Sequence, residues 1–384
     1  MEAVCSNRMS FLSHVSVACV YQDVGESLLE DSPLTVYAKT KVLQMIKDSL
    51  QGFDTQTDDF TILSILHLLI SECGGFDEDV FDVHQEGLVR IIYQRGGIGN
   101  LGMNGKIAAF MTLTILSFTI LRGLSEPAML HGFVPSQRPS IVSEYPPPIS
   151  PLYAPNGDLS AIYGHCSDST YELLCDMHDI TRTFIARWNY ISGAFTPRSS
   201  SELASYDTHM GEIYTRLLYR PRTDEDLTPD YVYESCRLAG LIYCRSLVQG
   251  LPLSESGNVM YARSSGVNIG EGYSSRSSNT TIISALHDAL DSTDKSDSWC
   301  AMCGVFIWIC FVGGAASWPS THSVYGERGD VQVPAAWVRK CFALYTVKAG
   351  LSLGFERAAA IAEAQRTMLQ VQNLINLKRG IASQ

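Results

Sequence analysis

The sequence has few of the features on which most functional assignments rest. Basic residues are scarce: 28 Lys and Arg stand against 40 Asp and Glu, the net charge is −12, and the longest basic runs are pairs such as Lys378-Arg379. Such a chain cannot neutralise a row of phosphates, so direct binding to nucleic acid is not expected. The motifs G-x-S-x-G and H-E-x-x-H and the P-loop are also missing, which removes support for hydrolase, protease and kinase functions.

The cysteines do not form the pattern of a disulfide framework. There are eleven of them, an odd number, scattered singly from Cys5 to Cys341 with no signal peptide ahead of them. This usage is typical of reduced thiols in a cytosolic or nuclear protein. Cys175, His178 and Asp179 would share one face of a helix, but no fourth ligand accompanies them, so we expect neither a metal nor a cofactor.

Strand signals are missing as well, because no segment alternates convincingly between polar and apolar residues. Apolar residues instead recur at spacings of three and four, which predicts helices, and the 46% apolar content of 384 residues can fill a large core. We therefore predict an all-α fold, a single large domain over residues 1–384 with a hydrophobic pocket between helices. About eleven helices are expected, at Val36–Leu50, Phe60–Ile70, Val80–Tyr93, Ile107–Leu121, Tyr171–Ile191, Leu203–Leu218, Tyr231–Leu247, Ile282–Leu290, Trp299–Ala316, Ala335–Leu351 and Glu356–Leu377.

One apolar run is long enough to cross a bilayer. Trp299–Trp318 has 20 residues without a charge. It is rich in Cys, Gly, Ala and Ser rather than Leu and Ile, and no Lys or Arg cluster flanks it. We expect a central helix buried on all sides, and no membrane span.

Two long loops interrupt the helical pattern. The first, residues 135–165, includes a stretch from Pro135 to Pro155 that holds seven of the 15 prolines, and it should run extended. The second, residues 252–280, is rich in Ser and Gly between Ser254 and Ser278 and should be mobile.

A glycine-rich stretch imitates a dinucleotide-binding fingerprint. Residues 94–102 read QRGGIGNLG, in which Gly97 to Gly102 match G-x-G-x-x-G. That fingerprint needs a strand before its glycines, whereas the preceding residues here have helical periodicity. We interpret the glycines as a helix stop, with Gly96 or Gly97 as the left-handed residue that caps the helix.

The same stretch carries a family resemblance. HQEGLVRIIYQRGGIGNLG, at residues 84–102, resembles the His-x-x-Gly-Ala, Arg-Gly-Gly and Leu signature of the fungal-specific transcription factor domain, the second of its large families. YRP at 219–221, followed by ESCRLAGLIYCRSL at 234–247, is similar to that family's Cys-Arg-x-Ala-x-x-Ile-Tyr helix. The resemblance covers roughly residues 11 to 375. It implies an all-helical fold and, by analogy with the family's sterol-sensing members, a hydrophobic small-molecule ligand.

The sequence departs from the family in one respect. Members usually carry an N-terminal binuclear zinc cluster of six cysteines that reads DNA, and none precedes Phe11. Cys300, Cys303 and Cys310 have the spacing of half such a cluster, but apolar residues separate them and the second half is missing. We interpret these three thiols as buried, small apolar residues near one helix face.

Four residues are candidate hydrogen-bond donors to a bound molecule. They are predicted from residue type and helical placement alone: His67, Tyr214, Tyr243 and Trp308. For His67, set among apolar neighbours in TILSILHLLI, a hydrogen-bonded core histidine is the alternative. For the aromatic residues, the alternative is an ordinary place in the core or on the surface.

Two functions follow, and the sequence favours the first narrowly. In the first, the chain folds a polycyclic or terpenoid-like substrate of fungal secondary metabolism and catalyses a cofactor-free cyclisation of the Diels-Alder kind, which requires positioning rather than a nucleophile or a metal. In the second, it regulates transcription, either by dimerising with a zinc-cluster partner or by sensing a ligand. Either function places the protein in the cytoplasm or the nucleus, and it could form a homodimer.

Overall fold

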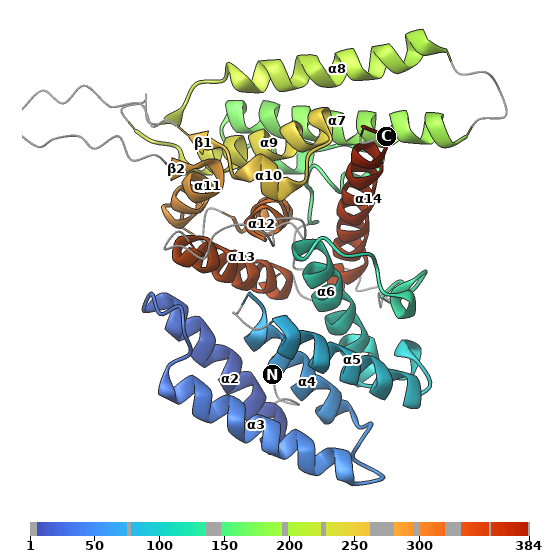
Figure 1. Cartoon of the computed structure of the whole chain (residues 1–384), viewed down its shortest axis with the longest axis vertical. Helices are drawn as coiled ribbons and strands as arrows, with labels where there is room; N and C mark the ends of the chain where they lie inside the picture. Colours follow the sequence, from blue (N-terminus) through green and yellow to red (C-terminus); the bar gives the residue numbers. More distant parts are fainter. Residues whose placement is uncertain are drawn as a thin grey trace, which may run out of the picture. The chain divides into compact units, whose positions relative to one another are not determined.

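The computed structural model describes residues 6–74, 78–135, 147–193, 199–223, 228–261, 280–294, 299–318, 332–352 and 355–382. Thirteen α-helices account for most of these residues, with a few short 3-10 turns and one pair of two-residue strands (Figure 1). The all-α fold expected from the spacing of apolar residues is confirmed.

All eleven expected segments are helical, and two helices were not foreseen. The longer of these is α2 (Arg8–Gly25), whose buried face includes Ser10, Ser13 and Ser16. The hydroxyls of Ser13 and Ser16 donate to the carbonyl oxygens of residues 10 and 13, at 2.8 and 2.7 Å. Because serine packs this face, the apolar period that predicts a helix is missing from the sequence. The other, α10 (Leu253–Gly257), is only five residues long.

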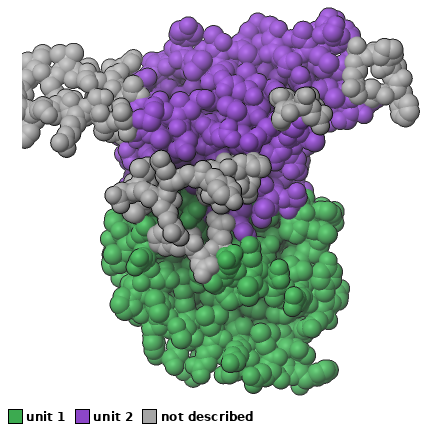
Figure 2. Space-filling model, viewed as in Figure 1, with its two compact units in different colours: residues 1–119, 126–145, 329–362 green, residues 120–125, 146–328, 363–384 purple. Residues whose placement is uncertain are grey.

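The chain divides into two compact units, coloured separately in Figure 2. Each unit is assembled from segments that are far apart in the sequence. Unit 1 consists of residues 1–119, 126–145 and 329–362, and unit 2 of residues 120–125, 146–328 and 363–384.

Unit 1 is built around α4 (Asp59–Glu72), in which every residue from Thr61 to Ser71 is buried. Helices α2, α3 and α5 pack against it, and α13 packs against α2. Side chains of Asn7, Ser32 and Asp58 accept backbone N–H bonds at the starts of α2, α3 and α4. The other helices of this unit are α3 (Pro33–Gln51), α5 (Glu78–Gln94), α6 (Lys106–Leu121, to Thr119) and α13 (Gln332–Ser352).

Unit 2 contains the apolar helix α12 (Cys303–Ser317), which is buried at every residue from Cys303 to Ala316. It packs against α9, α10 and α11, so the expected central buried helix is confirmed. Helices α7, α8 and α9 pack against one another beside it (Figure 1). The helices of this unit, apart from α10 and α12, are α7 (Asp168–Ser192), α8 (Ser200–Leu218), α9 (Tyr231–Gln249), α11 (Ile282–Asp291) and α14 (Ala358–Ala382, from Glu363).

Among the described residues, one helical stretch passes a length and composition test for a membrane span. It is Met103–Leu121, of which 83% is buried within the protein, as in the core helix of a globular fold. Helix α12 is shorter than this test requires.

The two expected loops are only partly described. Residues 136–146 and 262–279 lie outside the described residues. The described part of residues 135–165 holds two 3-10 turns and a bridge between Ser150 and Tyr153. The second loop was expected to be mobile between Ser254 and Ser278. Its two ends instead contain regular structure: α10, and a strand pair formed by β1 (Met260–Tyr261) and β2 (Thr280–Thr281).

Candidate functional site

The glycine-rich stretch ends a helix, as the sequence predicts. Gly96, at φ +89°, follows the last turn of α5, and its N–H donates to the carbonyl oxygen of Tyr93 at 3.0 Å. The N–H of Gly97 donates to the carbonyl oxygen of Ile92 at 2.9 Å. This pair of bonds is the Schellman motif, so these backbone N–H groups satisfy the end of the helix and are not directed at a phosphate.

The arginine of the same stretch ties the end of α5 to the start of α4. Arg95 donates to Asp59 Oδ1 at 3.0 Å and to the carbonyl oxygen of Thr57 at 2.6 Å. The N–H of Gly102 donates to the same Asp59 oxygen at 3.2 Å. A Cβ added at Gly102 would overlap the Asp59 carboxylate, so this glycine is required for a close packing contact within the protein.

Gly102→Ala should therefore destabilise the protein by about 1 to 2 kcal/mol, because the Asp59 carboxylate must leave its two donors. Gly99→Ala is the matched control, since an added Cβ there has nothing within 4 Å, and it should change stability by less than about 0.5 kcal/mol. The measurement is urea unfolding followed by circular dichroism. Equal effects of the two substitutions would contradict the packing role of Gly102.

The second signature segment places an ion pair in the core of unit 2. Arg237 donates through Nε to Glu234 Oε2 at 2.8 Å and through Nη2 to Oε1 at 2.7 Å. The Tyr261 hydroxyl lies 2.7 Å from Arg237 Nη2 and 3.0 Å from Glu234 Oε1. Burial lowers the pKa of Arg237, but the hydrogen bonds and charge of Glu234 outweigh it and the net shift is upward. The sequence analysis did not predict this pair, although a spacing of three between Glu234 and Arg237 on one helix is a signal that could have indicated it.

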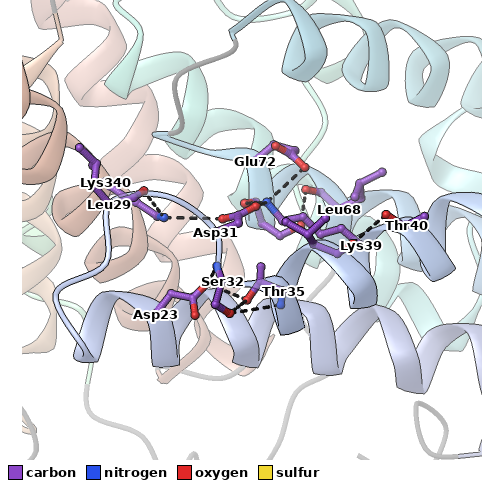
Figure 3. A network of polar contacts seen from close by, with 12 residues as sticks. Asp23, Leu29, Asp31, Ser32, Thr35, Lys39, Thr40, Leu68, Glu72 and Lys340 are labelled. Atoms are coloured by element: carbon purple, nitrogen blue, oxygen red, sulfur yellow. Dashed lines mark hydrogen bonds and ion pairs between the residues drawn. The ribbon is translucent and has the colours of Figure 1, made fainter.

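Unit 1 has its own polar network, shown in Figure 3. Lys39 Nζ donates to Asp31 Oδ2 at 2.6 Å and to the carbonyl oxygen of Ser71 at 2.9 Å, and it lies 3.3 Å from Glu72 Oε1. Lys340, from α13, donates to the carbonyl oxygen of Leu29 at 2.8 Å and lies 3.7 Å from Asp31. Two buried ammonium groups thus share one carboxylate and join α3, α4 and α13.

At Lys340 and Asp23, burial and the polar partners shift the pKa in opposite directions. Burial lowers the pKa of Lys340 and the Asp31 carboxylate opposes the shift. At Asp23, burial raises the pKa, but hydrogen bonds from Thr35 and Ser32 hold it below its usual value. These groups bond to one another, so we interpret the network as structural.

Lys39→Met should destabilise the protein by about 1 to 3 kcal/mol, because Asp31 and the Ser71 carbonyl lose a charged donor in a buried place. Lys47→Met, on the exposed side of the same helix, serves as the control and should change stability by less than about 0.5 kcal/mol. Thermal unfolding of the two variants in the same buffer distinguishes them. A cost at Lys39 no greater than at Lys47 would argue against the network.

Of the four predicted donors, His67 lies in α4 and is 6% exposed. Its Nδ1 lies 2.9 Å from Ser13 Oγ, and its ring packs against His14 and Phe110 at centroid distances of 5.4 and 5.8 Å. Burial, with a smaller contribution from His14, lowers the pKa of His67 to about 3. The ring is therefore neutral at physiological pH.

Tyr243 and Trp308 come together in the core of unit 2, with their rings 5.9 Å apart in a T-shaped arrangement. The Tyr243 hydroxyl lies 3.0 Å from Thr181 Oγ1, which itself donates to the carbonyl oxygen of Met177 at 2.7 Å. Tyr243 must therefore donate to Thr181, and burial raises the pKa of Tyr243. The Trp308 indole N–H is buried without a hydrogen-bond partner among the described residues. Tyr214 is half-buried on α8, apart from this pair, and burial raises its pKa.

Cys300, Cys303 and Cys310, the thiols of the incomplete zinc pattern, do not form a metal-binding cluster among the described residues. Cys303 and Cys310 are buried in α12, as expected, but Cys300 precedes the helix and is exposed, so the prediction of burial is wrong there. No cluster of metal-ligating side chains occurs within the part of the chain that the structure describes.

A hollow of about 400 Å³ opens on unit 2 between the loop 151–157, α7 and α14. Its polar lining includes His178, Arg182, Glu363 and Thr367, and Thr181 separates it from Tyr243. Sequence reasoning missed this site, because its two charged residues lie on helices far apart in the chain and match no motif. None of the four predicted donors lines it.

These features define an all-α protein. Arg95, Arg237 and Tyr243, which lie in the segments that carry the family resemblance, form hydrogen bonds to residues of its own helices. A family model described as a fungal specific transcription factor domain matches residues 5–330, which is most of the chain, and the protein belongs to that family. Comparison with curated proteins and with solved structures finds no significant match.

Proposed function

We propose that this chain regulates transcription in the fungal nucleus and reaches DNA through another protein. The observation that carries the proposal is the family match over residues 5–330. The net charge of −12 supports an indirect contact, because DNA-binding surfaces need clustered cations to displace counterions.

The roles of the signature residues support the same function. Arg95 binds Asp59, Arg237 binds Glu234 and Tyr243 donates to Thr181. Side chains that are committed to internal contacts maintain a scaffold and are not free to react with a bound molecule themselves. A scaffold of this kind suits a protein that presents surfaces or a ligand site to other molecules.

The test is deletion of the gene in the fungus that encodes it, followed by transcript sequencing and complementation. Wild type should restore the altered transcripts, and so should Arg90→Gln, which changes a charge on an exposed side chain. Arg237→Met, which breaks the buried ion pair, should not restore them. Unchanged transcripts in the deletion strain, with a biosynthetic intermediate accumulating, would overturn the proposal and favour catalysis.

A cofactor-free cyclase of the Diels-Alder kind is a second candidate, and one observation favours it. The Trp308 indole N–H is a buried donor that no described residue satisfies, and such a group is expected to have a partner. A donor directed at a substrate carbonyl could lower a barrier by roughly 2.7 to 4 kcal/mol.

This candidate is tested with purified protein and extract from the deletion strain. Wild type should change the product ratio, and Trp308→Phe, which keeps a ring and removes the donor, should lose most of that effect. Equal activity of wild type and Trp308→Phe would remove Trp308 from the mechanism, and no product change with wild type would remove the cyclase function itself.

A further inference from the structure

The hollow on unit 2 has a well-defined wall in the loop 151–157. Ser150 and Tyr153 exchange two backbone hydrogen bonds of 2.9 and 3.1 Å, which close a tight turn. Upstream of it, the backbone of Pro148 lies so close to α12 that a Cβ on Gly304 would overlap it. The loop is therefore held against the core of the unit, as a preformed binding site requires.

Two opposite charges line this hollow without neutralising each other. Arg182, on α7, and Glu363, at the start of the unit 2 part of α14, both line it. Neither forms an ion pair or a hydrogen bond through its charged group with another described residue, whereas Arg187 on α7 and Arg216 on α8 are paired with Asp207 and Asp176. A cation and an anion that face one cavity but remain apart are complementary to a molecule that carries both charges.

His178 adds a hydrogen-bond acceptor. Its Nδ1 lies 3.2 Å from the carbonyl oxygen of Pro151, which can only accept, so Nδ1 carries the proton. Burial, together with Arg182, lowers the pKa of His178, although the bond to Pro151 opposes the shift. In this neutral ring Nε2 is an acceptor, and it is buried without a partner among the described residues.

Glycine at position 157 makes the approach of these groups possible. Gly157 has φ +73°, and a Cβ there would lie 2.8 Å from Arg182 Nη1 and 4.0 Å from His178 Nε2. Its neighbour Asn156 also has a positive φ, of +57°. Glycine adopts such a conformation without steric cost, so the loop can turn close to Arg182 and His178.

We propose that this hollow binds a small zwitterion with an apolar side chain, of the amino-acid class. The carboxylate pairs with the guanidinium of Arg182, and the ammonium donates to Glu363 and to Nε2 of His178. The apolar part packs on Leu152 and Ile185, which line the same hollow. The volume of about 400 Å³ lies within the range of small-molecule sites.

The test is calorimetric titration of the full chain with L-phenylalanine and L-leucine, compared with 3-phenylpropionate and 2-phenylethylamine, which each carry one of the two charges. At least one amino acid should bind saturably below about 10 mM, and 3-phenylpropionate and 2-phenylethylamine should each bind at least about tenfold more weakly than L-phenylalanine. Failure of both amino acids to saturate at that concentration overturns the proposal, and so does equal binding of L-phenylalanine and either single-charge analogue.

Single-charge variants sharpen the test. Arg182→Gln should weaken amino-acid binding by about tenfold or more and leave 2-phenylethylamine unweakened. Glu363→Gln should weaken amino-acid binding similarly and strengthen 3-phenylpropionate, because it removes a repulsive carboxylate. Arg90→Gln and Glu86→Gln make the same charge changes on α5 of unit 1 and should have no effect.

Both lining residues are exposed, so the variants should fold normally, and unchanged unfolding temperatures would verify this. Unaltered affinities in both lining variants would overturn the assignment of the two charges. The site stands apart from the regulatory function: amino-acid binding by purified protein and transcript changes in a deletion strain are separate measurements.

Discussion

Arg237→Met is expected to destabilise the protein by about 3 to 5 kcal/mol, because it leaves the Glu234 carboxylate buried without a counter-charge. Arg237 and Glu234 are 3% and 7% exposed, and two short hydrogen bonds join them. The Tyr261 hydroxyl also loses a partner. Urea unfolding followed by circular dichroism measures the change.

The control for this prediction is an exposed pair of the same chemistry. Arg90 and Glu86, on α5, are 79% and 73% exposed and 3.7 Å apart, so Arg90→Met should cost less than about 0.5 kcal/mol. The double variant Glu234→Gln with Arg237→Met should recover part of the loss, because no buried charge then remains unpaired. Similar costs for Arg237→Met and Arg90→Met would show that the buried pair contributes no more than a surface one.

Acidification should destabilise the protein through His67. Its pKa is about 3 in the folded protein and about 6.5 when unfolded, so between these values the unfolded state binds more protons. The contribution is fully present above pH 6.5 and falls by about 1.4 kcal/mol for each pH unit below it. Between pH 6.5 and about pH 4.5 the loss should approach 3 kcal/mol.

The comparison that isolates this residue is His67→Gln, because burial also lowers the pKa values of His84 and His178, which contribute in the same direction. Free energies of unfolding at several pH values should fall more steeply for wild type than for His67→Gln. Parallel pH profiles would mean that His67 protonates as readily in the folded state as in the unfolded one.

The predicted site residues show how far sequence reasoning reaches. His67, Tyr214, Tyr243 and Trp308 were predicted as donors from residue type and helical placement alone, with a hydrogen-bonded core histidine as the alternative for His67. The structure buries His67, Tyr243 and Trp308 and leaves Tyr214 half-buried. Their partners could not be predicted, since Ser13 and Thr181 come from other helices. A cavity that these residues line stays a prediction, as do the cyclase function and a homodimer.

The sequence by itself determined where eleven of the thirteen described helices lie and how α5 ends. The three and four spacing of apolar residues reflects the side chains that a helix buries on one face, and glycine after α5 reflects a backbone conformation that other residues adopt at a cost. Both are local properties, so they can be read without knowing the fold.

Only the tertiary structure decided which polar groups meet. Helix α2 escaped detection because serines fill the face that it buries against its neighbours, and Arg182 and Glu363 line one hollow although they lie on distant helices. Lys39 and Lys340 converge on Asp31 in the same way. The energies of such contacts depend on burial and distance, and both arise from the packing of helices and not from the order of residues along the chain.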